Sequence, residues 1–105
     1  MAKPPKKPNA KRSPRPKRCA YTSTFNKAWE RYQRAGMRDM ALASDVMAMI
    51  FQGKTLPAEY KDHEFTGNWD GARECHLGGD FLLVYQLSGD LVTFVDLGSH
   101  SELFG

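Results

Sequence analysis

Residues 81–98, FLLVYQLSGDLVTFVDLG, decide the fold of this chain. Residues 81–87 form a near-continuous apolar run, which is typical of a strand that is buried on both faces. Residues 88–90 (Ser-Gly-Asp) are a tight-turn signal, and residues 91–97 form a second strand pattern that ends at Gly98. The stretch therefore predicts a β-hairpin.

Two helical patterns precede this hairpin. Apolar residues recur at helical spacing from Phe25 to Tyr32, with Thr24 as the expected N-cap and Gly36 as the end of the helix. A second helix is expected to start at Asp39 or the residue before it, with an apolar stripe from Met40 to Ile50, and Gly53 ends it. Because only a few residues separate the two patterns, we expect the helices to form an antiparallel hairpin.

Two further strands complete the predicted order. Residues 18–23 and 72–77 carry β-favouring side chains without glycine or proline, and two glycines turn the chain after the second of these segments. Residues 54–68 are expected to be irregular. The order strand, helix, helix, strand, strand, strand predicts an α+β fold, with a two-helix hairpin on one face of a small, mostly antiparallel sheet.

The chain of 105 residues fits one domain, residues 18–105, preceded by a tail of residues 1–17. The tail is rich in proline and lacks a periodic apolar pattern, so we expect it to be disordered. Residues 1–18 hold eight basic side chains and no acidic one, whereas the rest of the chain is acidic overall. This asymmetry indicates a polyanion, first of all a nucleic-acid backbone, as the partner of the tail. A merely solubilising extension is the alternative.

Cysteine usage and hydropathy restrict the class of protein. Cys19 and Cys75 are far apart and lack metal-type spacing, so we expect free thiols in a reducing compartment, with one disulfide left open as an alternative. The basic start has no apolar segment and is therefore no secretory signal. The longest apolar run, residues 81–85, is too short to cross a bilayer. We expect a soluble, cytoplasmic protein with no membrane partner.

Several short motifs lie at consistent spacing in the C-terminal half: residues 60–63 (YKDH), 67–71 (GNWDG), 73–76 (RECH), Asp80, and 98–104 (GSHSELF). Together they resemble the YafQ-type toxins of the RelE/ParE superfamily of bacterial toxin–antitoxin systems. The resemblance does not extend to the tail. It implies a RelE-like fold and an endoribonuclease, an mRNA interferase that cleaves mRNA in the ribosomal A site and is inhibited by a tightly bound antitoxin.

The resemblance also implies which residues act. His63, His76 and His100 matter for cleavage in such toxins, and so do the residues matching Asp80 and Phe104. Metal-free RNA cleavage needs a base for the 2′-OH, an acid for the leaving 5′-oxygen and positive charge near the phosphorus. Histidine suits the first two roles near neutral pH, and we expect His76 and His100 to share them.

The remaining roles are supporting ones. We expect His63 to support the phosphate, Asp80 to orient a histidine, and Phe104 to stack on an unpaired base. Glu74 is either a second carboxylate of the site or a surface residue of its strand. No cofactor and no metal is expected, because no set of Cys, His and carboxylate residues shows zinc spacing.

One position departs from the family pattern. Related toxins place an arginine two residues before the glycine of the Gly-Ser/Thr-His motif, where it neutralises transition-state charge, but here that residue is Asp96. Lys61 or Arg73 would then supply the RNA-binding charge. Slow cleavage, or loss of cleavage with retained antitoxin binding, are the other outcomes. Asp96 pointing away from the site into solvent is the structural alternative.

Two other functions stay open at this point. A non-enzymatic binder of the same fold would inhibit DNA gyrase, or would serve only as an antitoxin-binding regulator. Asp96 favours such a binder, whereas three histidines in intact motifs argue against it. A general RNA-binding protein acting through its tail is the other alternative. The expected partners of the leading function are a cognate antitoxin, mRNA on the ribosome, and ribosomal RNA bound by the basic tail.

Overall fold

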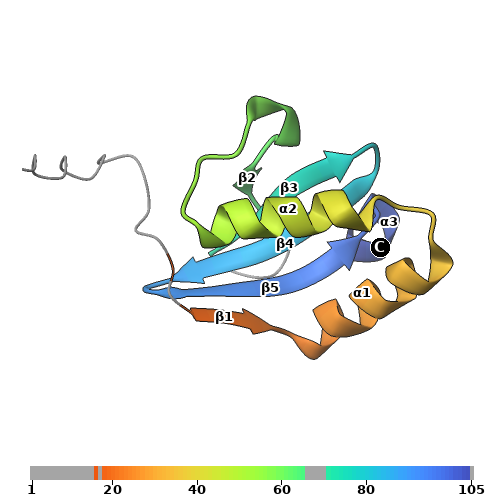
Figure 1. The fold of residues 1–105 in the computed structure, drawn as a ribbon, viewed down its shortest axis with the longest axis horizontal. Coiled ribbons are helices and arrows are strands. Elements are labelled where there is room, and N and C mark those ends of the chain that lie inside the picture. The colour runs from red at the N-terminus through yellow and green to blue at the C-terminus, as the bar shows by residue number, and fades with distance from the viewer. Residues whose placement is uncertain (1–15, 17, 66–70, 105) are drawn as a thin grey trace, which may run out of the picture.

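The computed structural model describes residue 16, residues 18–65 and residues 71–104, so the expected tail and the 67–71 motif lie almost wholly outside the described residues. The hairpin expected from the sequence is confirmed: strand β4 (Phe81–Ser88) pairs antiparallel with β5 (Leu91–Gly98). Strand β4 is central in the order β1-β5-β4-β3-β2 (Figure 1). Its first five residues are all buried, as the apolar run predicts.

The other strands extend the sheet on both sides. Strand β3 (Ala72–Gly78) pairs antiparallel with β4, and β2 (His63–Glu64) adds two residues antiparallel to β3. Strand β1 (Arg18–Tyr21) pairs in parallel with β5 at the opposite edge. The mostly antiparallel α+β order is therefore confirmed. Strand β2 and the 3-10 helix η1 (Ala58–Tyr60) were not predicted, because each is too short to show a periodic pattern.

The first helix, α1 (Ser23–Ala35), begins earlier than expected. Thr22 and not Thr24 is its N-cap, since the Thr22 hydroxyl oxygen accepts the backbone N–H of Phe25 at 2.9 Å. The same hydroxyl donates to the backbone carbonyl of Val95 at 2.6 Å. The tertiary contact with β5 decides between two threonines that are equally good caps by sequence.

The helix boundaries around the α1–α2 connection are confirmed. Gly36 ends α1 in the left-handed region with φ of 68°, where a residue without Cβ is favoured. Asp39 caps α2 (Met40–Phe51) by accepting the N–H of Leu42 at 2.9 Å. Gln52 caps the C-terminus of α2, and Gly53 follows it with φ of 74°. Among the described residues, no helix is long and apolar enough to cross a membrane.

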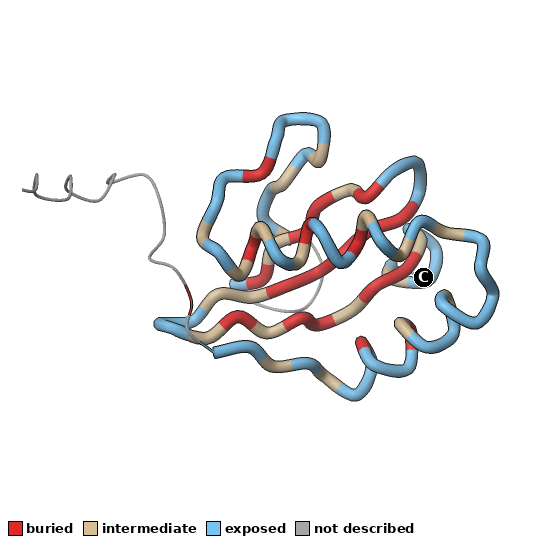
Figure 2. The backbone as a smooth tube through the Cα atoms, in the orientation of Figure 1, coloured by how far each residue is buried: buried red, intermediate tan, exposed pale blue. Residues whose placement is uncertain are grey.

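Both long helices cover the same face of the sheet, as predicted (Figures 1 and 2). Helix α1 packs mainly on β5, and α2 contacts β3. Burial of apolar surface on this face is the main source of stability. The core between helices and sheet contains Phe25, Ala28, Ala43, Val46, Ile50, Leu56, Cys75, Leu77, Phe81, Leu83, Tyr85, Val92, Phe94 and Leu97.

The expectation of two free thiols is confirmed. Cys19 is exposed on the edge strand, whereas Cys75 is completely buried in the core. Burial, together with the charges of Asp62 and Glu74, raises the pKa of the Cys75 thiol to about 12. Cys75 is therefore an inert core residue.

The opposite face of the sheet carries a smaller apolar patch. Ala72, Val84 and Val95 pack there against Phe65 and Leu103. The strand pairing shifts register beside Val84, and this bulge lets Val95 join the patch. The short helix α3 (His100–Phe104), which supplies Leu103, lies against this face (Figure 1). The sequence limited the segment after residue 98 to about one turn of helix, and α3 has that length.

Candidate active site

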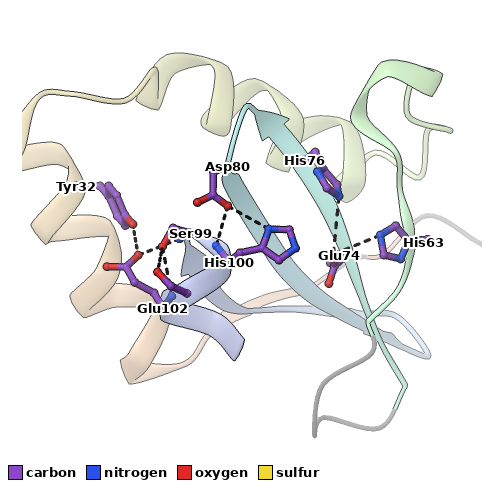
Figure 3. A network of polar contacts seen from close by, with 9 residues as sticks. Tyr32, His63, Glu74, His76, Asp80, Ser99, His100 and Glu102 are labelled. Atoms are coloured by element: carbon purple, nitrogen blue, oxygen red, sulfur yellow. Dashed lines mark hydrogen bonds and ion pairs between the residues drawn. The ribbon is translucent and has the colours of Figure 1, made fainter. Parts of the chain in front are cut away.

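The fold gathers the three histidines on the face of the sheet that α1 and α2 leave open. His63 on β2 lies opposite Glu74 on β3, and His76 follows on the same face two residues later. His100 is the first residue of α3. The ring centres of His63 and His76 are 5.9 Å apart, and those of His76 and His100 are 6.3 Å apart (Figure 3). The three imidazoles therefore form one row.

Glu74 lies between two of these rings. Glu74 is only 3% exposed. Its Oε2 is 3.3 Å from His63 Nε2 and 3.8 Å from His76 Nε2 (Figure 3). Its other oxygen, Oε1, is buried and has no hydrogen-bond partner among the residues that the structure describes. Glu74 therefore lies buried beside these histidines and is not a surface residue of its strand. A buried carboxylate oxygen without a hydrogen-bond partner lowers the stability of the fold, so Glu74 must serve a role other than stability.

The environment of His76 favours its neutral form. Burial lowers the pKa of His76 most strongly, and the positive charges of His63, Lys61 and His100 lower it further. The carboxylate of Glu74 acts in the opposite direction but does not outweigh them. His76 is therefore a ring with an available lone pair near neutral pH, as a proton acceptor requires.

Asp80 holds His100 by two contacts. Oδ1 of Asp80 accepts the backbone N–H of His100 at 2.9 Å and lies 3.1 Å from its ring Nδ1 (Figure 3). These hydrogen bonds, with that from the backbone first, lower the pKa of Asp80. A carboxylate at Nδ1 fixes the orientation and tautomer of an imidazole and leaves Nε2 to transfer a proton. Two glycines with positive φ, Gly78 and Gly79, make the turn that places Asp80.

Phe104 lies at the solvent side of this row. Its ring centre is 5.4 Å from that of His100 and 5.5 Å from that of Phe65. The residue is 43% exposed, which is unusual for a large apolar side chain. Two adjacent aromatic rings with an open side form a surface on which a nucleobase can stack.

Of the two basic residues proposed from the sequence, the structure brings only Lys61 near the histidines. Lys61 follows η1 in the left-handed conformation, with φ of 47°, and its charge acts on His76. Arg73 lies beside Tyr85 on the helix-covered face, and its Nε donates to Asp62 Oδ1 at 3.3 Å. The Tyr85 hydroxyl donates to the same oxygen at 2.8 Å. Arg73 is thus outside the histidine row, because strand alternation turns it away from Glu74 and His76.

Asp96 lies opposite Val84 and therefore on the same face of the sheet as the site. Its carboxylate accepts the backbone N–H of Leu97 at 2.8 Å. Burial, helped by the negative charge of Glu102, raises the pKa of Asp96. Asp96 is partly buried and does not point away into bulk solvent, and the charges of Glu102 and Arg31 act on it.

His63, Glu74 and His76 could also hold a metal ion. Each offers one ligand atom, and these atoms lie within 4.8 Å of one another. Two imidazole nitrogens and one carboxylate suit Zn²⁺ or Cu²⁺. Sequence spacing did not reveal this set, because only the pairing of β2 with β3 brings His63 to Glu74.

A second polar cluster beside the row was not predicted from the sequence. Glu102 of α3 contacts Tyr32 and Arg31 of α1, and it also accepts the backbone N–H of Ser99 at 2.9 Å (Figure 3). Ser99 returns a hydrogen bond by accepting the N–H of Glu102 at 3.2 Å. This reciprocal pair is a capping box, and the spacing Ser-x-x-Glu in the sequence could have indicated it.

Solved structures define the class of protein. A chain of the Escherichia coli DinJ–YafQ toxin–antitoxin complex superposes with a TM-score of 0.79 and 32% identity, covering 87% of this chain and 99% of that one. A metal-bound toxin from Helicobacter pylori superposes with a TM-score of 0.74 and 35% identity, covering 83% of this chain and 98% of that one. Fold and site together define a small bacterial toxin with a RelE-like fold.

Residues 17–105 match the family described as the bacterial toxin of type II toxin–antitoxin system, YafQ, and the chain belongs to this family. The mRNA interferase toxin YafQ of Escherichia coli (strain B / BL21-DE3) is 34% identical over 86 residues, which are 81% of this chain and 92% of that protein. The family and the RelE-like fold expected from the sequence are confirmed. The name of this relative agrees with the expected endoribonuclease.

Proposed function

We propose that this toxin cleaves mRNA on the ribosome by metal-free proton transfer along the histidine row. In this reaction the 2′-oxygen attacks phosphorus and gives up its proton, while the P–O5′ bond breaks and the 5′-oxygen receives a proton. The products are a 2′,3′-cyclic phosphate and a 5′-hydroxyl. The observation that carries the proposal is the convergence of three imidazoles, with Asp80 on one of them, on a single open face.

His76 acts as the base and His100 as the acid. The lowered pKa of His76, caused first by burial, keeps this ring ready to accept the 2′-OH proton. Asp80 orients the other ring and leaves its Nε2 to protonate the 5′-oxygen. The ring centres are 6.3 Å apart, so the two rings are close enough to act on the 2′-oxygen and the 5′-oxygen of the same phosphodiester.

His63 and Glu74 support the base. Glu74 lies within reach of both His63 and His76, so it orients the two rings and balances the positive charge that His76 acquires. His63 Nδ1 is 2.8 Å from the backbone carbonyl oxygen of Glu64, which favours a proton on Nδ1. His63 is more exposed than His76 and is the ring best placed to meet a phosphate from solvent.

Positive charge at the phosphate comes from Lys61 in place of the arginine that Asp96 replaces. Lys61 has a positive φ of 47°, a conformation that costs about 1–3 kcal/mol in a residue other than glycine, and such backbone strain concentrates at functional sites. Arg38 is a second candidate cation, because its guanidinium lies 4.9 Å from the ring centre of Phe81, the residue after Asp80. Arg73 is assigned a supporting role through Asp62 and is not proposed to contact RNA.

The ribosome and the antitoxin are the proposed partners. Phe104 and Phe65 would stack on a base that the ribosome presents unpaired. The basic residues of the tail would bind ribosomal RNA, which offsets the acidic character of the folded part. Deleting residues 1–17 should then weaken ribosome binding and reduce its salt dependence; unchanged cosedimentation would contradict this role. The Escherichia coli relative forms a toxin–antitoxin complex, DinJ–YafQ, and this supports a cognate antitoxin as the inhibitor of the present toxin.

The test of the proposed function is His100→Ala in a translating lysate programmed with a defined mRNA. Wild type should produce discrete cuts within the reading frame with cyclic-phosphate and 5′-hydroxyl ends, and His100→Ala should abolish them. Glu30→Gln, an exposed change on α1 outside the histidine row, is the control and should leave cleavage intact. Retained cleavage by His100→Ala would refute the acid assignment. Intact mRNA with blocked replication would favour the non-enzymatic gyrase inhibitor, for which Asp96 is the one supporting observation.

A further inference from the structure

Helix α3 carries both His100 and Phe104, yet it has only five residues. An isolated helix of this length does not form in water, because nucleation is costly and few hydrogen bonds follow. Contacts with the rest of the protein must therefore hold it. Leu103 supplies one such contact in the small apolar patch, but the leucine is only partly buried. Asp80 holds the first residue of the helix, His100, and the polar contacts of Glu102 connect the helix to α1.

Glu102 is a junction between α3 and α1. Its carboxylate accepts the hydroxyl proton of Tyr32 and lies 3.4 Å from the guanidinium of Arg31, both on α1. The same carboxylate accepts the N–H of Ser99 at the start of α3 (Figure 3). The hydrogen bond from Tyr32, followed by that from Ser99, lowers the pKa of Glu102, so the carboxylate is ionised at neutral pH.

On the α1 side, this junction is anchored on the main core. Tyr32 packs its ring against Phe81, with 5.0 Å between ring centres, and Phe81 is 2% exposed in the main core. The tyrosine therefore connects the core directly to Glu102. Arg31 contributes less, because both partners of this ion pair are about half exposed and screened by water.

Gly98 leaves the space that the carboxylate occupies. A Cβ at position 98 would lie 2.6 Å from Glu102 Oε1 and 3.3 Å from its Cβ. Any side chain there would push the carboxylate away from Tyr32 and Ser99. The glycine before Ser99 thus has a packing reason that is independent of backbone conformation.

We infer that Glu102, held by Tyr32 and admitted by Gly98, is a positioning residue that fixes His100 and Phe104 in the site. The inference rests on the proposed function, in which both residues act on RNA. Glu102 itself does not touch the reacting atoms. It acts by keeping α3 docked, so that His100 stays between Asp80 and His76.

The sharpest variant is Tyr32→Phe, which removes one hydroxyl and keeps the ring on Phe81. We expect the single-turnover cleavage rate at saturating ribosomes to fall about fivefold, as for loss of one hydrogen bond to a charged group at a partly exposed site. Gly98→Ala should give a similar loss by displacing the carboxylate. Glu102→Gln keeps an acceptor for Tyr32 and Ser99 and should restore most of the rate relative to Glu102→Ala.

Amide hydrogen exchange gives a readout that does not depend on activity. The Leu103 N–H bonds to the Ser99 carbonyl at 3.0 Å within α3. Its exchange should accelerate in Tyr32→Phe and Gly98→Ala, whereas amides in β4 should not change. Tyr21→Phe, which removes a tyrosine hydroxyl near Cys19 instead, is the matched control. Unchanged rate and unchanged Leu103 exchange in both variants would overturn the inference.

The two proposals fail in different ways. If His100→Ala retains cleavage while Tyr32→Phe accelerates exchange at Leu103, the junction exists but the acid assignment is wrong. If His100→Ala is inactive while Tyr32→Phe behaves as wild type in both measurements, the nuclease assignment stands and Glu102 has no positioning role. A double variant, Tyr32→Phe with Glu102→Ala, should be no slower than Glu102→Ala alone, because both changes break one contact.

Discussion

Replacing Asp62 with alanine should destabilise the protein by about 2–3 kcal/mol, because a buried hydroxyl loses its acceptor. Tyr85 is only 3% exposed, and its hydroxyl donates to Asp62 Oδ1 at 2.8 Å. Leaving such a donor unpaired costs about 1–3 kcal/mol. The ion pair of Asp62 with Arg73 adds at most about 1 kcal/mol, since both side chains are partly exposed to water. Asp62→Asn keeps an acceptor oxygen and should cost less than about 1 kcal/mol.

Urea unfolding measures these differences as shifts of the midpoint at constant slope. Glu59→Ala, an exposed change in the neighbouring η1, is the control and should stay within about 0.5 kcal/mol of wild type. In a Tyr85→Phe background Asp62→Ala should cost much less, because no hydroxyl is left unpaired. If Asp62→Ala is as stable as wild type, or equally harmful in both backgrounds, the reasoning is refuted.

Three further predictions concern the histidine row. Lys61→Ala removes a positive charge that lowers the pKa of His76, so the acid limb of the pH–rate profile of cleavage should move to higher pH. Glu74→Gln removes a negative charge that raises the same pKa, so the acid limb should move to lower pH. Shifts of both variants in the same direction would contradict the assignment of His76 as the base. Because burial lowers the pKa of His76 in the folded state, the unfolded chain binds more protons than the folded one below about pH 6.5, and the free energy of unfolding should fall as the pH decreases. The urea midpoint of His76→Gln should depend less on pH than that of wild type. Added Zn²⁺ should inhibit cleavage by binding to His63, Glu74 and His76, and a chelator should leave the metal-free protein active. Zinc inhibition that His63→Gln does not weaken, or cleavage that requires added metal, would count against the mechanism.

Features with a local cause were predictable from the sequence. Gly36 and Asp39 mark their helix boundaries because each acts on its own backbone or on a neighbour three residues away. The apolar run of β4 shows its burial directly, since a strand covered on both faces needs no polar residues. Thr22 is the instructive failure. Its advantage over Thr24 comes from the carbonyl of Val95, which sequence proximity does not reveal.

The candidate site was predictable only where motif resemblance replaced geometry. Periodicity gave no information on which face of β3 the helices cover. It therefore could not separate Glu74, which lies beside the histidines, from Arg73, which is on the opposite face of the strand. The contact of Tyr32 with Glu102 joins residues that are 70 positions apart. Side chains meet at such separations only through the complete tertiary fold, and no single segment carries the information.

The five-stranded sheet separates the residues that stabilise the fold from the row of histidines, so substitutions on its two faces have different consequences. Its helix-covered side holds nearly all of the apolar mass, and its open side holds the imidazoles. Volume-conserving substitutions among the buried aliphatic residues can therefore accumulate during divergence while the imidazole row stays unchanged. Exceptions are Asp62 and Glu102, whose polar contacts pass around the edge or end of the sheet. We expect lineages of this toxin to exchange apolar residues of similar volume elsewhere in the interior, and to change Asp62 and Glu102 only together with their partners.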